Sequence, residues 1–198
     1  MRTESFDTLN TGLLDKVVWA MRTAQVRRHL PREAGVTADL GCGFHAPLLR
    51  TLLNHGYATR GIGVDLAPNM ALANDTLSLL QGDLNAPVDI PDHHVDVVFS
   101  LAVIEHLERP EVHAREMYRV LKPGGTLLLT TPSPRGKPVL EFLAYGLGVI
   151  DRREIDDHKQ YFDGARLVET LAHAGFERSR ISAHTFQLGL NNMIIARR

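Results

Sequence analysis

The chain has 198 residues, of which 44% are hydrophobic and 23% are charged. This composition is typical of one globular domain and excludes collagen-like, low-complexity and wholly disordered chains. Its 22 Lys and Arg residues nearly balance 23 Asp and Glu residues, which leaves a formal net charge of −1. The sequence therefore lacks the basic excess that attracts duplex nucleic acid or an anionic membrane, and we expect neither as a partner.

The cysteine and histidine content bounds the metal and redox chemistry. One cysteine, Cys42, excludes an internal disulfide and a cysteine-only zinc site. The 10 histidines are scattered, and none has the HExxH spacing of a zinc-binding helix. We predict no metal centre. The first ten residues lack the apolar core of a signal peptide, and no apolar run approaches the roughly 20 residues of a membrane-spanning helix. These features favour the cytoplasm.

Helices and strands alternate along the first two thirds of the chain. The apolar spacing predicts a helix over 9–30, a strand over 36–40, a helix over 46–55 and a strand over 60–66. A short helix starting at Pro68 follows. Further strands are predicted over 76–84, 95–102 and 126–131, with a helix over 111–121 that stops at Lys122-Pro-Gly-Gly125. The later elements are a helix over 164–174 and two strands over 178–186 and 191–197.

This alternation predicts an α/β fold with a Rossmann-like, doubly wound and mostly parallel sheet. The loop near 187–190 is short enough to pair the last two strands antiparallel, so we expect an antiparallel strand at the C-terminal end. Residues 1–198 are predicted to form a single domain. Within it, residues 1–31 form an N-terminal helical cap, and 132–163 form a lid with some helix near 139–147.

The first site-bearing motif is Asp39-Leu-Gly41-Cys-Gly43, placed between a predicted strand and a predicted helix. Glycines without a β-carbon allow a sharp turn and close approach of a ligand to the backbone. The N–H groups at the start of the following helix point at that ligand. In an open α/β sheet, ligands bind at this edge. A plain tight turn is the alternative explanation.

Two further strands end in an acidic residue at the same edge. Asp65 follows Gly63-Val64, and a carboxylate there accepts hydrogen bonds from a ribose diol; a helix N-cap is its alternative role. Asp83, in Gly82-Asp83-Leu84, could accept from an exocyclic amine such as that of adenine. An ordinary turn would also explain Asp83.

The chain resembles the class I S-adenosylmethionine-dependent methyltransferases, in particular their small-molecule branch with the ubiquinone and menaquinone methyltransferases. The resemblance covers about residues 36–198. It is carried by the order and spacing of six stretches: ADLGCGF, GVDLAP, QGDLNAP, VDVVFSLAVIEHLERP, MYRVLKPGGTLLLTTP and HKQYFDGARLVETLAHAGF.

The resemblance implies S-adenosyl-L-methionine as cofactor and assigns a set of residues to it. Asp39, Gly41 and Gly43 would hold its methionine portion, and Asp65 its ribose hydroxyls. Leu66, Asp83 and Leu84 would surround the adenine, and Ser100 with Leu101 would face the sulfonium. One departure concerns the family's frequent third loop glycine, which is His45 here.

A dinucleotide-binding oxidoreductase or epimerase is the main alternative. Gly41-Cys-Gly43-Phe-His-Ala46 also fits G-x-G-x-x-A, with an acidic residue about 20 positions on. Tyr118 and Lys122 have the Tyr-x-x-x-Lys spacing of reductases, but Lys122 falls where the predicted helix stops. A non-catalytic protein that binds S-adenosylmethionine is the third hypothesis.

The predicted reaction is methyl transfer to a hydroxyl or an aliphatic amine of a small metabolite, a lipid-like quinone or a sugar, and a hydroxyl is the expected acceptor group. Ser100-Leu-Ala-Val lacks the Asn/Asp-Pro-Pro-aromatic signature of enzymes that methylate flat amines. An alcohol must lose its proton, so candidate bases are His106 and His158. Candidate acceptor-binding residues are Glu105, Tyr161 and Trp19. The alternatives are a structural role in the turn for His106, lid packing for His158 and Tyr161, and a place in the core for Trp19. Glu105 could instead steady His106, bind a metal as in some quinone methyltransferases, or face water. The oligomeric state is left open.

Overall fold

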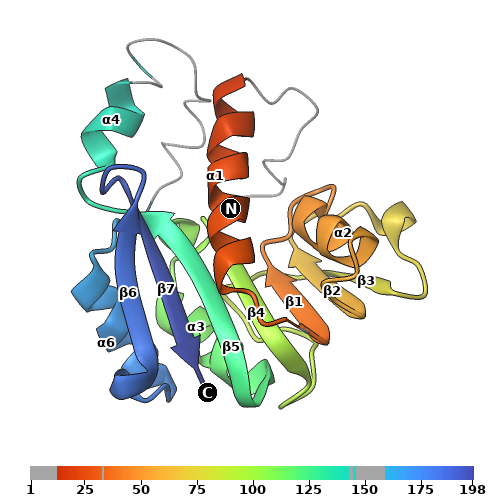
Figure 1. The fold of residues 1–198 in the computed structure, drawn as a ribbon. Helices are drawn as coiled ribbons and strands as arrows, with labels where there is room; N and C mark the ends of the chain where they lie inside the picture. The colour runs from red at the N-terminus through yellow and green to blue at the C-terminus, as the bar shows by residue number, and fades with distance from the viewer. Residues whose placement is uncertain (1–12, 33, 143–144, 146–158) are drawn as a thin grey trace.

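The computed structural model describes residues 13–32, 34–142, 145 and 159–198. The strands within them are β1 Val36–Leu40, β2 Arg60–Asp65, β3 Leu77–Gln81, β4 Val95–Leu101, β5 Leu121–Pro132, β6 Ile181–Phe186 and β7 Asn191–Arg197. They form one sheet in the order β3-β2-β1-β4-β5-β7-β6 (Figure 1). Strands β1 to β5 all pair in parallel, and β7 runs antiparallel to both of its neighbours, β5 and β6. The Rossmann-like, mostly parallel sheet with an antiparallel C-terminal strand is confirmed.

Helices cover both faces of this sheet (Figure 1). They are α1 Leu13–His29, α2 Pro47–Asn54, α3 Pro110–Val120, α4 Lys137–Glu141 and α6 Gly164–Ala174, with short 3-10 turns η1 Met70–Leu72, η2 Ile104–His106 and η4 Arg178–Arg180. Side chains of α1 and α2 form one buried cluster with the face of the sheet that carries Phe99 and Leu128. Side chains of α3 and α6 form another with the face that carries Val98 and Leu129. We call these the α1 face and the α3 face.

Local sequence signals account for the helix ends near the site. Pro47 occupies the first turn of α2, where its missing N–H leaves no hydrogen bond unmade. The Asp163 side chain accepts from the N–H of Arg166 and caps α6. Gly175, with φ of 118°, ends α6 in the left-handed region that favours glycine. The predicted helices at these places are confirmed within a residue or two.

Five predicted elements differ from the structure. Strand β5 begins at Leu121 and runs through Lys122-Pro-Gly-Gly125, because Val95 pairs with Leu121 across a bulge. Strand β3 is shorter than predicted, ending at Gln81. Residues 178–180 form η4 before β6, and the short helix near Pro68 is η1. Of the lid helix predicted near 139–147, the described part lies in α4, which starts earlier, at Lys137.

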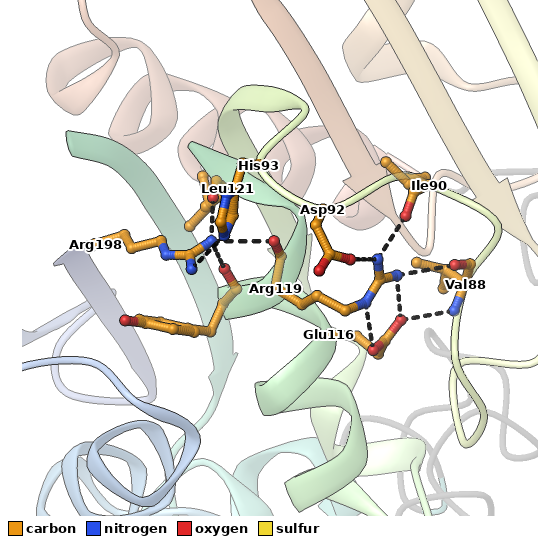
Figure 2. A network of polar contacts seen from close by, with 9 residues as sticks. Val88, Ile90, Asp92, His93, Glu116, Arg119, Leu121 and Arg198 are labelled. Atoms are coloured by element: carbon orange, nitrogen blue, oxygen red, sulfur yellow. Dashed lines mark hydrogen bonds and ion pairs between the residues drawn. The ribbon is translucent and has the colours of Figure 1, made fainter. Parts of the chain in front are cut away.

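The loop between β3 and β4 is fastened to α3 by one arginine (Figure 2). Arg119 donates to the carboxylate of Glu116 at 2.7 Å and to the backbone carbonyls of Val88 and Ile90 at 3.0 and 2.7 Å. Glu116 in turn accepts from the N–H of Val88 at 2.8 Å. Burial alone would raise the pKa of Glu116, but its hydrogen bonds with Arg119 and Val88 lower it overall. This network fixes the loop that follows the end of β3.

The parallel strands place their carboxyl ends on one edge of the sheet. Register pairs Asp39 with Gly63, and Asp65 with Gln81 on β3. It also pairs Asp39 with Phe99, two residues before the end of β4. Asp39, Asp65 and the end of β4 therefore lie at neighbouring strand ends, as the sequence predicted. Among the described residues, no helix is both long and apolar enough to cross a membrane.

Candidate active site

Asp39 is a buried carboxylate at the end of β1, on the α1 face. It is 4% exposed, and its Oδ1 has no hydrogen-bond partner within the described part of the chain. Burial, together with the negative charge of Asp65, raises the pKa of Asp39 to about 8. A buried carboxyl that meets no partner is suited to a cationic ligand, which would restore the ionised form.

The glycine loop after Asp39 folds back over the end of β2. The N–H groups of Gly41 and Cys42 donate to the Val64 carbonyl at 2.8 and 3.1 Å. Gly41 has φ of 99°, and a Cβ there would meet Val103 Cγ2 at 2.3 Å. Both the backbone conformation and the space therefore require glycine at this position. Because the loop carries no side chain here, its backbone stays accessible to a ligand.

His45, the departure from the family loop, precedes an unusual helix start. Ala46, the N-cap residue of α2, is left-handed with φ of 43° and provides no side-chain cap. The His45 ring lies edge-on to the ring of Phe44, with 4.9 Å between ring centroids. The chain thus reaches α2 through a strained residue.

Asp65 and Leu66 end β2 beside this loop. One oxygen of Asp65, Oδ2, accepts from the Gly43 N–H at 2.9 Å, so Asp65 holds the glycine loop itself. Leu66 is half-buried, and its carbonyl accepts from Gln81 Nε2 at 2.9 Å. The N-cap role considered for Asp65 is not the one seen, because Asn69 caps η1.

Asp83 and Leu84 follow β3. Asp83 Oδ1 accepts from both the N–H and the Nδ2 of Asn85 at 2.9 Å, which closes a turn. Asn85 Oδ1 accepts from the N–H groups of Glu108 and Arg109 at 2.9 and 3.0 Å. Leu84 is buried in the core under the α3 face. The turn role of Asp83 is present, and its contact with adenine stays a prediction.

The end of β4 holds a pair that the sequence analysis missed. Ser100 is fully buried, and its Oγ lies 2.9 Å from Nε2 of His113 on α3. Burial lowers the pKa of His113 to about 4, so the ring is neutral at physiological pH. Its Nδ1 has no hydrogen-bond partner in the described structure, which favours the tautomer with the proton on Nε2, donating to Ser100. The Ser100 side chain is fully buried on the α3 face, whereas Leu101 is half-buried on the α1 face, so we expect a cofactor on the α1 face to meet the backbone of Ser100 rather than its hydroxyl.

Two candidate acceptor-binding residues, Glu105 and Tyr161, and one candidate base, His106, lie near the turn after β4. Glu105 is 1% exposed; its carboxylate accepts from Thr131 Oγ1 at 2.9 Å, and its carbonyl accepts from the N–H of Lys159 at 2.9 Å. Burial and the carboxylates of Glu141 and Glu105 raise the pKa of Tyr161 to about 12. His106 is half-buried at the end of η2. Glu105 and Tyr161 are thus brought together.

The remaining candidates lie elsewhere. Trp19, on α1, is half-buried and packs against the same cluster as Leu101 on the α1 face. His158 lies outside the described residues. Lys122 belongs to β5 and forms an ion pair with Asp96 at 2.8 Å, so Tyr118 and Lys122 do not share a helix as a reductase pair would. Within the described ranges, no group of three or more His, Cys, Asp or Glu residues could hold a metal ion.

A glycine loop, a buried carboxylate and a second acidic strand end, gathered at one edge of a Rossmann-like sheet, define a binding site for an adenosine-bearing ligand. Within this broad class, sequence comparison narrows the assignment. A family model described as a methyltransferase domain matches residues 38–129. This match, together with the relatives described next, supports a class I S-adenosylmethionine-dependent methyltransferase.

Named relatives support this family. A probable S-adenosylmethionine-dependent methyltransferase of Mycolicibacterium smegmatis is 32% identical, over 84% of this chain and 62% of that protein. The mitochondrial ubiquinone biosynthesis O-methyltransferase of Dictyostelium discoideum is 30% identical, over 61% of this chain and 41% of that protein. The chain thus spans less than two thirds of the length of these curated relatives. Others are named tRNA U34 carboxymethyltransferase and ajmaline N-methyltransferase, so the names do not agree on one acceptor.

The fold is also similar to that of a solved methyltransferase structure. The crystal structure of an S-adenosylmethionine-dependent methyltransferase from Mesorhizobium loti matches with a TM-score of 0.68 at 21% identity, over 94% of this chain and 100% of that one.

Proposed function

We propose that this chain transfers the methyl group of S-adenosylmethionine to a hydroxyl group of a small-molecule acceptor. The observation that carries the cofactor assignment is the unpartnered oxygen of Asp39, buried beside a glycine loop that Asp65 holds in place. The methionine portion of the cofactor bears an ammonium group, which is the cation that such a carboxylate would accept. Asp39, Gly41 and Gly43 would hold that portion, with Asp65 at the ribose.

Leu66, Asp83 and Leu84 are proposed at the adenine, and Leu101 with the Ser100 backbone beside the sulfur. When bound, the cofactor supplies a methyl group already activated on a positively charged sulfur. The residues at the end of β4 then need only to align the acceptor oxygen behind that carbon, and alignment alone contributes about 7–11 kcal/mol in well-oriented reactions. The acceptor oxygen would form the new O–C bond with the sulfur as the leaving group, and the hydroxyl proton would have to leave.

The proton must pass to a base or to water. His106 is half-buried in the turn after β4 and is proposed as that base, with His158 as the second candidate. Glu105 and Tyr161 are proposed on the acceptor side, since Glu105 lies in η2 after β4 and its charge is near enough to Tyr161 to help raise the pKa of that residue. The near-zero net charge supports a small-molecule acceptor over nucleic acid, and the one cysteine is in keeping with a cytoplasmic setting.

Two measurements test the proposal. Calorimetry should show S-adenosylhomocysteine binding that Asp65→Ala weakens, and no fluorescence enhancement of NADH on mixing. Incubation with S-adenosylmethionine and a panel of phenols, alcohols and alkylamines should give methyl ethers by mass spectrometry. Methylated amines alone would reject the hydroxyl assignment. Cofactor binding without turnover of any acceptor would favour the non-catalytic alternative.

A further inference from the structure

Thr130, near the end of β5, has a buried hydroxyl group without a partner. Its residue is 0% exposed, and Oγ1 makes no hydrogen bond within the described structure. Its neighbour Thr131 is equally buried, but its hydroxyl donates to Glu105 at 2.9 Å. Buried polar groups are nearly always hydrogen-bonded, since an unpartnered one loses its bonds to water and gains nothing. A ligand would provide the hydrogen bond that the hydroxyl of Thr130 lacks.

The register places this hydroxyl next to the proposed site of methyl transfer. Thr130 pairs with Leu101 of β4, and the preceding pairs on the same face join Leu128, Phe99 and Asp39. Residues paired in parallel strands share a face, so Asp39 and Thr130 both lie on the α1 face, on the strands that flank β4. Among the side chains that the structure describes on this face, Asp39 and Thr130 are the buried ones with an oxygen that has no hydrogen-bond partner.

The surroundings of Thr130 on this face are apolar. Its pairing partner on β7 is Met193, which is fully buried. Trp19 of α1 and Leu101 are half-buried and pack against the same cluster as Met193. Helix α1 lies on this face of the sheet (Figure 1) and contacts β5. A ligand that reached Thr130 would thus meet apolar walls and one hydroxyl group.

We propose that the Thr130 hydroxyl binds the acceptor, hydrogen-bonding the hydroxyl group that receives the methyl. This proposal rests on the proposed function and names the substrate class: a compact, largely apolar molecule, such as a phenol, with its hydroxyl directed at β5. Because a threonine hydroxyl can donate, it can hold the acceptor oxygen through one of that oxygen's lone pairs, which leaves the acceptor's proton for the proposed base. The acceptor oxygen keeps a lone pair for the carbon held at Leu101.

The first test compares the adjacent threonines by thermal unfolding, which needs no ligand. Thr130→Val removes an unsatisfied hydroxyl while keeping the shape, so Tm should stay the same or rise. Thr131→Val breaks a buried hydrogen bond and leaves the Glu105 carboxylate without that donor, so Tm should fall. A fall for Thr130→Val as large as that for Thr131→Val would show a structural partner and overturn the proposal.

The second test measures binding of 4-nitrophenol, in the presence of S-adenosylhomocysteine, by quenching of Trp19, the one tryptophan. N-acetyltryptophanamide corrects for the inner-filter effect. The wild type and Thr130→Ser should bind saturably, while Thr130→Val should bind about fivefold or more weakly, as expected for one lost hydrogen bond. Its affinity for S-adenosylhomocysteine should stay within about twofold of wild type, because Asp39 is untouched.

Unchanged 4-nitrophenol binding by Thr130→Val, or no saturable quenching of the wild type, would overturn the proposal. Absence of S-adenosylhomocysteine binding in calorimetry would instead refute the proposed function. The comparison of the two threonine variants by Tm would still decide whether the Thr130 hydroxyl is unsatisfied.

Discussion

Asp39 makes the affinity for the cofactor depend on pH in a predictable direction. Its pKa in the ligand-free protein is about 8 because it is buried near Asp65. A cationic ammonium group binds the ionised form, so the protein must first lose a proton below that pH. The ionised fraction is about one half at pH 8 and about 1% at pH 6, which weakens the apparent affinity about 50-fold over this range, or about 2.3 kcal/mol.

Isothermal titration calorimetry with S-adenosylhomocysteine measures this effect directly. Titrations at pH 7 in two buffers of different ionisation enthalpy should show release of about 0.9 proton per ligand bound. Asp39→Asn has no carboxyl group to ionise, so its weaker binding should lack this pH dependence, which also corrects for titration of the ligand. Asp65→Asn removes the neighbouring negative charge and should move the break in the curve to lower pH.

The stability of the free protein should show the opposite trend. Between the pKa of an unfolded aspartate, 3.8, and about 8 the folded state holds one more proton than the unfolded state at Asp39. Its contribution to stability therefore falls as pH rises through this window, and Asp39→Asn should lack this loss. A wild-type affinity that is flat from pH 6 to 8 would refute the argument, because Asp39 would then be ionised already or would not touch the ligand.

Three further substitutions test the surrounding framework. Gly41→Ala should weaken S-adenosylhomocysteine binding about tenfold or more and destabilise the fold by about 1–3 kcal/mol. The control is Gly56→Ala, which has a left-handed φ of 69° but nothing within 4 Å of an added Cβ, and it should leave binding intact. Equal losses of binding in the two variants would contradict the argument that a Cβ at Gly41 clashes with Val103. As pH falls from 7 to 5, the unfolded state protonates His113 before the folded state does, because the pKa of His113 is about 4 in the folded protein. Urea unfolding should therefore show that the wild type loses about 2 kcal/mol of stability over this range. His113→Gln should lack this loss. Arg119→Met leaves the Glu116 carboxylate and two carbonyls without their donor, so the urea midpoint should fall by the equivalent of about 2–3 kcal/mol, with affinity for the cofactor product nearly unchanged; a neutral result would show that the loop after β3 needs no such link.

The sequence predicted the strand ends well, because the signals there are local. Gly41 and Gly43 both have a positive φ, which favours glycine, and Asp65 follows an apolar run directly, while Asp83 follows the end of β3 after one glycine. What the pattern could not show is the partner of each carboxylate. Asp65 holds the Gly43 N–H and Asp83 closes a turn with Asn85. Both contacts depend on loop geometry rather than on spacing.

His113 shows a signal that was present but passed over. It lies four and seven residues before Met117 and Val120, on the buried stripe of α3. A histidine on such a stripe needs a hydrogen-bond partner from the sheet, and Ser100 is the buried hydroxyl that provides it. The start of β5 was out of reach for another reason. Lys122-Pro-Gly-Gly125 reads as a break, and only the bulge opposite Val95 allows the strand to continue.

The polar residues at the ends of β1, β4 and β5 divide by the face they occupy. On the α3 face, Ser100 lies against His113 and Thr131 donates to Glu105, so the fold itself provides their partners. On the α1 face, Asp39 and Thr130 each keep an oxygen without one. Successive residues of a strand point to opposite faces. The adjacent threonines of β5 therefore differ: the Thr131 hydroxyl hydrogen-bonds within the fold, and the Thr130 hydroxyl is the one proposed to bind a ligand. The chemistry of methyl transfer is therefore expected on the α1 face, and the side chains of α1, Trp19 among them, should select the acceptor.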